Sequence, residues 1–327
     1  MKRAIVLILA LSVMTTGAFA GGQAEDDGER VAGIVFQADQ FFQIIQLGMQ
    51  AAADEYGADL LLGNSDNSPQ KEIELINNYL TAGVDAIAIS PLSETASVQA
   101  LEEANEEGVE IVTYNSPLGA DFPVSYINSS QYELGSSTGE AAAEYVSGMS
   151  GDAINVAVLA FDSQLPEISD QRVSGFLDAL EESGKNVNIV SRQDGYLAEM
   201  ALQTSTDIMT ANDELDLIFA ANEGGTVGAV QAVRNAGRAG ETVVFGTDAT
   251  QQLTQFLLAD DGVLQAVTGQ QPFEIGFQAV ENAILASRGE SVEAEVIVPG
   301  VLLTRERPDD VRDFQEELES IMQQIGG

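Results

Sequence analysis

The sequence predicts an α/β protein built of two doubly wound lobes with parallel sheets, and three observations support this. Strand-like and amphipathic helix-like segments alternate from Val31 onward. Several strands are continuous apolar runs, the pattern of parallel strands covered on both faces. The rhythm breaks once, at Val124 to Gln131, as a segment crossing between lobes would require. The alternation alone also permits a single (β/α)8 barrel.

The first lobe begins with a strand at Val31 to Phe36, a loop containing Asp39, and an amphipathic helix from Phe41. Ser68 is suited to cap the second helix, Pro69 to start it and Gly83 to end it. Further strands are expected at 59–62, 86–90, 110–114 and 124–127, and a third helix ends near residue 107.

The same alternation then begins again. Strands are expected at 155–160, 187–191, 217–220, 242–246, 264–268 and around 292–298. Helices are expected at 132–149, 169–182, 197–211, 224–236, 251–258 and 272–287. A polar helix, from 305 to the end of the chain, follows the last strand and is expected to pack on one lobe.

The composition excludes several kinds of chemistry. The 327 residues include no cysteine and no histidine, so disulfides, thiolate or imidazole catalysis and ligation by either residue are absent. The formal charge of −39 disfavours binding to nucleic acid or to an anionic membrane. This acidity is consistent with adaptation to a high-salt external medium or with an ordinary acidic exported protein. Thermal melts at increasing NaCl concentration would distinguish the two, because only salt adaptation predicts stabilisation by salt.

The N-terminal residues have the pattern of a secretory signal. Lys2 and Arg3 precede an apolar core at 5–13, and Ala18-Phe19-Ala20 is a small-x-small cleavage site. We therefore expect a signal peptide at 1–20, a disordered start at 21–30, and a soluble mature protein that is periplasmic or secreted. The apolar core is too short to span a bilayer.

Asp39 lies at the carboxyl end of the first strand, where open α/β sheets bind ligands. Phe41 and Phe42 follow it after one intervening residue, Gln40. A hydrogen-bonding carboxylate beside flat apolar rings suits a sugar, which has polar edges and an apolar C–H face. The alternatives are that Asp39 only stabilises the helix N-terminus and that the rings belong to the core.

Eight short motifs, in order, resemble those of the ribose- and galactose-type periplasmic binding proteins, the substrate-binding subunits of bacterial ABC importers. They are Gln40-Phe41-Phe42, the strand ending Ser90-Pro91, Ile111 to Asn115, Ser130 to Gly135, Arg172 with Gly175-Phe176, Phe219 to Glu223, Gly246-Thr247-Asp248, and Gln270-Gln271-Pro272. Each motif is weak alone, but together they span nearly the whole chain after the signal segment.

The resemblance implies two lobes joined by three crossings, with a hinge motion that closes them on a ligand. We expect the crossings near 128–131, 268–271 and 293–296. The N-terminal lobe then comprises 31–129 with 271–293, and the C-terminal lobe 130–270 with 294–304. An acidic tail helix occupies 305–327.

The resemblance also implies a ligand site without catalytic, metal or cofactor groups. Its predicted residues are Asp39, Phe41, Phe42, Ser90, Asn115, Arg172, Tyr196, Asn222, Asp248 and Gln270. Each also has an ordinary structural alternative. Asp248 could cap a helix, Asn222 could form a turn, and Arg172 could make a surface salt bridge.

The chain departs from the ribose-binding pattern at two arginine positions, which Ser116 and Asp170 occupy here. There is also no tryptophan. Asp39, Asp170 and Asp248 could therefore form an acidic cleft for a polyol, an amino sugar or another cationic solute.

These observations predict a monomeric binding protein that captures a small sugar or polyol and delivers it to the permease of an ABC importer. A ligand-loaded sensor subunit for a membrane chemoreceptor or kinase is the alternative. A glycosidase lacks a carboxylate pair at recognisable spacing, and a dehydrogenase lacks the dinucleotide motif. A lactose-repressor-type regulator would need a DNA-binding head in place of an export signal.

Overall fold

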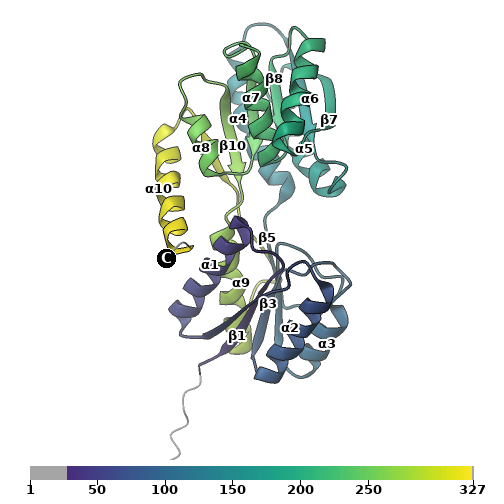
Figure 1. The fold of residues 1–327 in the computed structure, drawn as a ribbon, viewed down its shortest axis with the longest axis vertical. Coiled ribbons are helices and arrows are strands. Elements are labelled where there is room, and N and C mark those ends of the chain that lie inside the picture. The colour runs from purple at the N-terminus through teal and green to yellow at the C-terminus, as the bar shows by residue number, and fades with distance from the viewer. Residues whose placement is uncertain (1–27, 326–327) are drawn as a thin grey trace, which may run out of the picture.

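The computed structural model describes residues 28–325 as two α/β lobes stacked along the long axis of the molecule (Figure 1). The predicted signal segment at 1–20, and residues 21–27 of the predicted start, lie outside the described residues. Each lobe has its own six-stranded sheet, which confirms the two-lobed prediction over a closed barrel. No helix within 28–325 is long and apolar enough to cross a membrane.

The N-terminal lobe has the strand order β11-β5-β4-β3-β1-β2, and every neighbouring pair is parallel. The strands are β1 (Arg30–Val35), β2 (Asp59–Asn64), β3 (Ala86–Ile89), β4 (Glu110–Tyr114), β5 (Ser125–Asn128) and β11 (Glu295–Ile297). Helices α1 (Gln40–Tyr56) and α9 (Pro272–Ser287) cover one face, and α2 (Pro69–Ala82) and α3 (Val98–Glu106) cover the other.

The C-terminal lobe has the order β12-β10-β9-β8-β6-β7. Its strands are β6 (Ala153–Ala160), β7 (Asn186–Asp194), β8 (Leu217–Ala220), β9 (Val243–Thr247), β10 (Leu264–Gly269) and β12 (Val301–Thr304). Helices α4 (Gln131–Ser147) and α5 (Pro166–Glu181) pack on one face, and α6 (Ala198–Ala211), α7 (Glu223–Asn235) and α8 (Gln251–Leu257) on the other. Strand β12, antiparallel to β10, was not predicted.

The helix ends follow the local sequence signals. The hydroxyl of Ser68 accepts a hydrogen bond from the Lys71 amide at 3.3 Å, and Pro69 opens α2. Gly83 ends the helix with φ +72°, a left-handed conformation that glycine adopts without steric cost. Propensity and capping therefore define α2 as the sequence predicts.

Three chain crossings join the lobes, at 129–130, 270–271 and 298–300. The third lies later than predicted, because β11 pairs with β5 and so belongs to the N-terminal sheet. Residues 295–297, which the prediction gave to the C-terminal lobe, are therefore in the other one. The physical break is at Pro299-Gly300, where a proline without an amide donor ends the pairing.

Within each lobe, glycines allow pairs of helices to approach closely. An ideal Cβ on Gly276 of α9 would lie 2.0 Å from the carbonyl oxygen of Ile45 in α1. In the C-terminal lobe, a Cβ on Gly135 of α4 would lie 2.0 Å from the carbonyl oxygen of Arg172 in α5. These backbone contacts hold the helices that carry predicted site residues at fixed positions.

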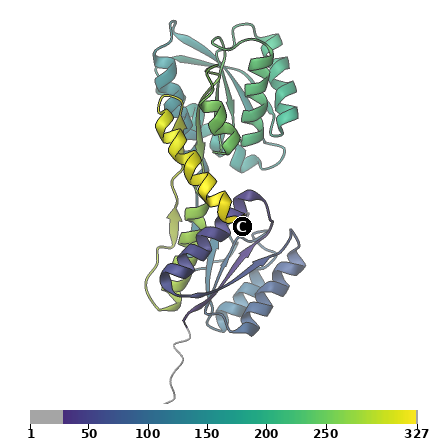
Figure 2. The same cartoon turned by 60° about the vertical axis from the view of Figure 1, so that its left-hand side comes forward.

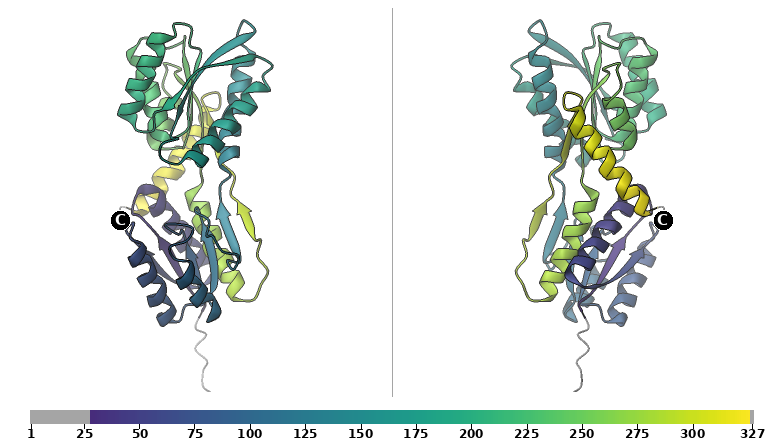
Figure 3. Two further views of the ribbon diagram at one scale, coloured as in Figure 1. Left: turned by 90° about the vertical axis from the view of Figure 1, so that its right-hand side faces the viewer. Right: turned by 90° about the vertical axis from the view of Figure 1, so that its left-hand side faces the viewer.

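The C-terminal helix α10 (Pro308–Ile325) differs from the prediction that it packs on one lobe. It packs against α8 and β12 of the C-terminal lobe and also contacts α1 of the N-terminal lobe. Figures 2 and 3 show it running from one lobe to the other, with its C-terminal end beside α1. The tail therefore contributes to the interface between the lobes.

Candidate ligand-binding site

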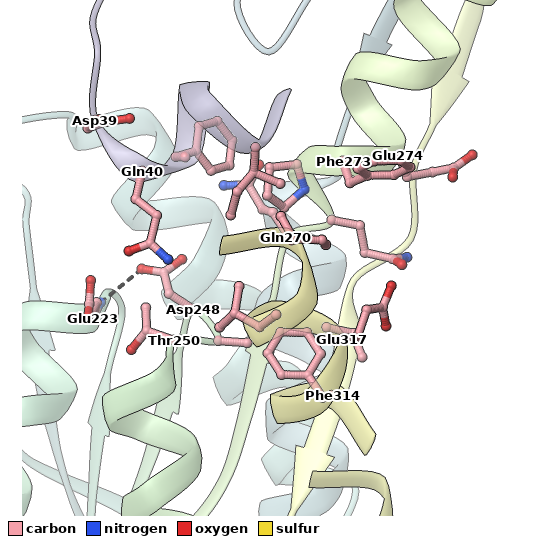
Figure 4. A pocket seen from close by; sticks show the side chains of 18 residues that line it. Asp39, Gln40, Glu223, Asp248, Thr250, Gln270, Phe273, Glu274, Phe314 and Glu317 are labelled. Carbon is pink, nitrogen blue, oxygen red and sulfur yellow. Dashed lines mark hydrogen bonds between the residues drawn. The ribbon is translucent and has the colours of Figure 1, made fainter. Parts of the chain in front are cut away.

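A cavity of about 450 Å³ lies between the lobes (Figure 4). Four predicted site residues line it, namely Asp39, Phe41, Asp248 and Gln270. The rest of its wall comes from α1, the starts of α7, α9 and β12, the loop after β9, the second crossing and α10. This is the placement expected for a ligand site, because strand ends of both lobes face it.

The N-terminal-lobe wall begins at Asp39, which caps α1. One oxygen of the Asp39 carboxylate accepts a hydrogen bond from the Phe42 amide at 3.0 Å, and the other accepts one from the Gln37 side chain. The carboxylate is solvent-exposed and retains acceptor capacity after both bonds. Asp39 thus combines the capping role with a position on the cavity wall.

The two adjacent phenylalanines have different environments. Phe41 is half-buried and lines the cavity. Phe42 is only 2% exposed and packs in the core of the lobe, with its ring centroid 4.5 Å from that of Phe36. The prediction that Phe42 packs on a ligand ring is thus at odds with the conformation seen here, because helical periodicity turns Phe42 inward and leaves Phe41 at the cleft.

We expect alanine substitutions at these two positions to have separate effects. Phe42→Ala should destabilise the protein by about 3–5 kcal/mol, the usual cost of truncating a core aromatic. Phe41→Ala should change unfolding by less than about 1 kcal/mol but weaken sugar binding, because a ring face at a ligand contributes about 1 kcal/mol. Chemical denaturation and binding calorimetry on both variants test this; equal losses of stability would contradict the assignment.

On the opposite wall, Asp248 follows β9 with φ +73°, a conformation that aspartate tolerates better than most residues. Its carboxylate accepts a hydrogen bond from the Glu223 amide at 2.9 Å and lies 3.5 Å from the Arg172 guanidinium. The side chain is 28% exposed, so part of it stays open to the cleft. Figure 4 shows Gln40 extending toward Asp248 from the other lobe.

Arg172 is 6% exposed and its guanidinium is largely occupied. It donates to the Gln131 side chain at 2.8 Å and to the Ala221 carbonyl at 2.9 Å. These bonds join the start of α4, the end of β8 and Asp248. The surface-salt-bridge alternative is wrong for Arg172, since the residue is buried and holds the Asp248 carboxylate in place.

Asn222 and Tyr196 lie next to this cluster but not on the cavity wall. The Asn222 oxygen accepts from the Gly225 amide at 3.0 Å, and its amide group donates to the Tyr196 carbonyl at 3.0 Å. The Tyr196 hydroxyl accepts a hydrogen bond from Gln164 at 3.1 Å. In this conformation Asn222 caps α7 and links it by a hydrogen bond to the loop after β7. One hydrogen of its side-chain amide remains free to bind a ligand.

Ser90 and Asn115 form a separate pair at the ends of β3 and β4. The Asn115 amide lies 3.5 Å from the hydroxyl of Ser90, which is fully buried. Asn115 has φ +59°, which turns the chain sharply after β4. The pair is on the N-terminal lobe, outside the cavity wall.

Of the three acids predicted for the cleft, Asp39 and Asp248 line the cavity and Asp170 does not. Asp170 does not line the cavity, because it is bound to Arg192 at 3.2 Å on the surface. Glu223, Glu274 and Glu317, which were not predicted, add to the acidity of the cavity wall. Burial raises the pKa of Glu223, the Thr250 hydroxyl opposes this, and the negative charge of Asp248 adds to the rise.

Sequence reasoning missed Glu223, although it directly follows the predicted Asn222. The only available signal was its place in the motif Phe219 to Glu223, where an acid follows the asparagine. The α10 residues Phe314 and Glu317 were missed as well. Within 28–325, no group of three or more acidic side chains is arranged to hold a metal ion.

Comparisons with known proteins agree with this fold. A family model described as the periplasmic binding protein domain matches residues 34–291. The chain therefore belongs to the periplasmic binding protein family, a class of solute-binding proteins. This confirms the family resemblance derived from the sequence motifs, and it identifies the protein as a binding protein rather than an enzyme.

Two relatives come from Escherichia coli. The ABC transporter periplasmic-binding protein YphF is 28% identical over 286 residues, covering 86% of this chain and 84% of the relative. The ribose import binding protein RbsB is 26% identical over 306 residues, covering 94% and 99% respectively. An ABC transporter periplasmic solute binding protein from Actinobacillus succinogenes, crystallised with bound D-allose, has a TM-score of 0.72 and 26% identity; 86% of this chain and 99% of that one are covered.

Proposed function

We propose that this protein is exported, binds a small neutral or amine-bearing sugar or polyol between its lobes, and delivers it to the permease of an ABC importer. The observation that carries the proposal is the interlobe cavity, where Asp39 and Phe41 of one lobe lie across from Asp248 of the other. A ligand that bridges both walls would stabilise a closed state that neither lobe stabilises alone.

The chemistry of the cavity supports a polyhydroxylated ligand. Carboxylate oxygens accept strong hydrogen bonds from hydroxyl groups, and the Gln270 amide offers both donor and acceptor. Phe41 supplies an apolar ring for a C–H face. No lysine or arginine lines this cavity within the described chain, which disfavours phosphorylated or carboxylated solutes.

The relatives favour import over sensing. The names of RbsB and YphF refer to ribose import and to ABC transport. The Actinobacillus protein holds D-allose. We therefore favour delivery to importer permease subunits over docking on a chemoreceptor, and co-purification of the loaded protein with permease or receptor would distinguish these partners.

A thermal-shift screen over pentoses, hexoses, polyols and amino sugars tests the proposed ligand class. A solute that binds only the folded protein adds about 2.7 kcal/mol at 100 times its Kd, which raises the Tm by several degrees. We expect at least one neutral sugar, polyol or amino sugar to do so. A flat response across the panel, or turnover of an aryl glycoside by the purified protein, would contradict the proposal.

A further inference from the structure

Helix α10 carries a narrow apolar stripe along its length. Val311, Phe314, Leu318 and Ile321 recur at spacings of three, four and three residues, which places them on one helix face. Val311 is fully buried and Leu318 is 8% exposed. The intervening positions are mostly acidic and exposed, so one face of the helix is suited to packing.

The first half of α10 is fixed to the C-terminal lobe. Val311 and Phe314 pack against its core. The Gln315 side chain donates a hydrogen bond to the Thr254 hydroxyl of α8 at 2.8 Å. Just before the helix, the Arg305 guanidinium donates to the carbonyls of Leu264 and Ala259, at 3.2 and 2.6 Å. This half therefore moves with the C-terminal lobe.

The second half of α10 extends to the other lobe. The helix contacts α1, and its residues Leu318 and Ile321 line the interlobe cavity together with Phe41 and Ile44 of α1. Figures 2 and 3 show the C-terminal end of α10 beside α1. All of α10 lies beyond residues 34–291, the span that the family model matches.

We propose that α10 is an interlobe brace, anchored on the C-terminal lobe and bearing on α1, that limits how far the lobes separate. The lobes pivot about three short crossings, so α1 must move relative to the C-terminal lobe whenever the cleft opens or closes. Because α10 is fixed to that lobe, each such motion changes the packing of its stripe against α1. Wide opening exposes apolar surface, which disfavours it.

The brace acts on the protein before any solute binds, so it is tested without one. The chain has no cysteine, which allows specific spin labels at Gln99→Cys in α3 and Gln203→Cys in α6, one exposed site on each lobe. Pulsed electron resonance then gives the distribution of interlobe distances. We expect a chain ending at Arg307 to show a distribution about twofold broader, extended toward longer distances.

A matched pair of point variants separates the brace from general destabilisation. Ile321→Gln changes the cavity-facing stripe, whereas Ser320→Gln changes the neighbouring exposed position of the same helix. We expect Ile321→Gln to broaden the distribution of interlobe distances and Ser320→Gln to leave it unchanged. We expect the two variants to have the same Tm. A wild-type distribution in Ile321→Gln, whatever the truncated chain shows, would overturn the brace. The outcome is independent of the sugar screen.

Discussion

Replacing Asp248 by asparagine is expected to lower the affinity for the bound sugar or polyol about 100-fold, which corresponds to about 2.7 kcal/mol. The carboxylate is the acceptor on the C-terminal wall of the cavity, and hydrogen bonds to a charged group contribute about 1.5–3 kcal/mol each. The neighbouring Arg172 guanidinium, 3.5 Å away, orients that carboxylate. Asparagine retains the shape but loses the charge.

Asparagine is the appropriate substitution because of the backbone at this position. The residue has φ +73°, and asparagine is among the side chains that tolerate this region. Its oxygen can still accept the hydrogen bond that the Glu223 amide donates. The fold should therefore survive, whereas alanine would combine backbone strain with the loss of that acceptor.

The measurement is calorimetric titration with the panel sugar that most raises the Tm of the wild-type protein. Asp170→Asn is the matched control, because Asp170 carries the same charge on the same lobe but binds Arg192 on the surface. We expect the control to bind like the wild type. Wild-type affinity in Asp248→Asn, or a comparable loss in Asp170→Asn, would show that the binding site lies elsewhere.

The fold was largely predictable because buried parallel strands and amphipathic helices have strong periodic signals. Strand β12 was missed because four residues after Pro299-Gly300 are too few to show a period. The third crossing was misplaced for a related reason. Residues 292–298 read as one strand, and only the pairing of β11 with β5 shows which lobe holds it.

The sequence predicted where the candidate site lies better than it predicted the role of each residue in it. The ends of β1 and β9 face the cleft in any such topology, so Asp39 and Asp248 could be identified from their places in the chain. Which polar side-chain atoms remain free to bind a ligand depends on the hydrogen bonds that these side chains already make within the protein. Asn222 uses its side chain to cap α7, and Arg172 is engaged by Gln131 and Ala221. The Asn222 cap is a local contact between residues three apart. The Arg172 contacts span more than 40 residues and depend on tertiary packing, which no local sequence pattern encodes.

The contribution of α10 to the cavity wall was the hardest feature to predict from the sequence. Its acidic composition is typical of a solvated surface helix. The apolar stripe indicates that one face is covered, but a stripe does not identify its partner. Only the arrangement of the lobes shows that Phe314 and Ile321 face a cavity shared with Phe41.

Substituting Gly276 by alanine is expected to destabilise the N-terminal lobe. The new Cβ would lie 2.0 Å from the Ile45 carbonyl oxygen, and backbone cannot rotate away as a side chain can. Forcing α9 and α1 apart costs about 3 kcal/mol, of which the better helix propensity of alanine returns about 1 kcal/mol. A net loss of about 2 kcal/mol lowers the Tm by about 5 °C.

Because α1 carries Asp39 and Phe41, the displaced helix should also weaken sugar binding. Gly148→Ala is the matched control: this glycine has φ −80° and ψ −13°, and an added Cβ meets its nearest atom at 3.5 Å. We expect that variant to melt at the wild-type temperature or slightly above, since alanine reduces the freedom of the unfolded chain. Calorimetric melts of both variants decide the matter. If Gly276→Ala melted like Gly148→Ala, the close backbone packing of α1 on α9 would not determine the stability of this lobe.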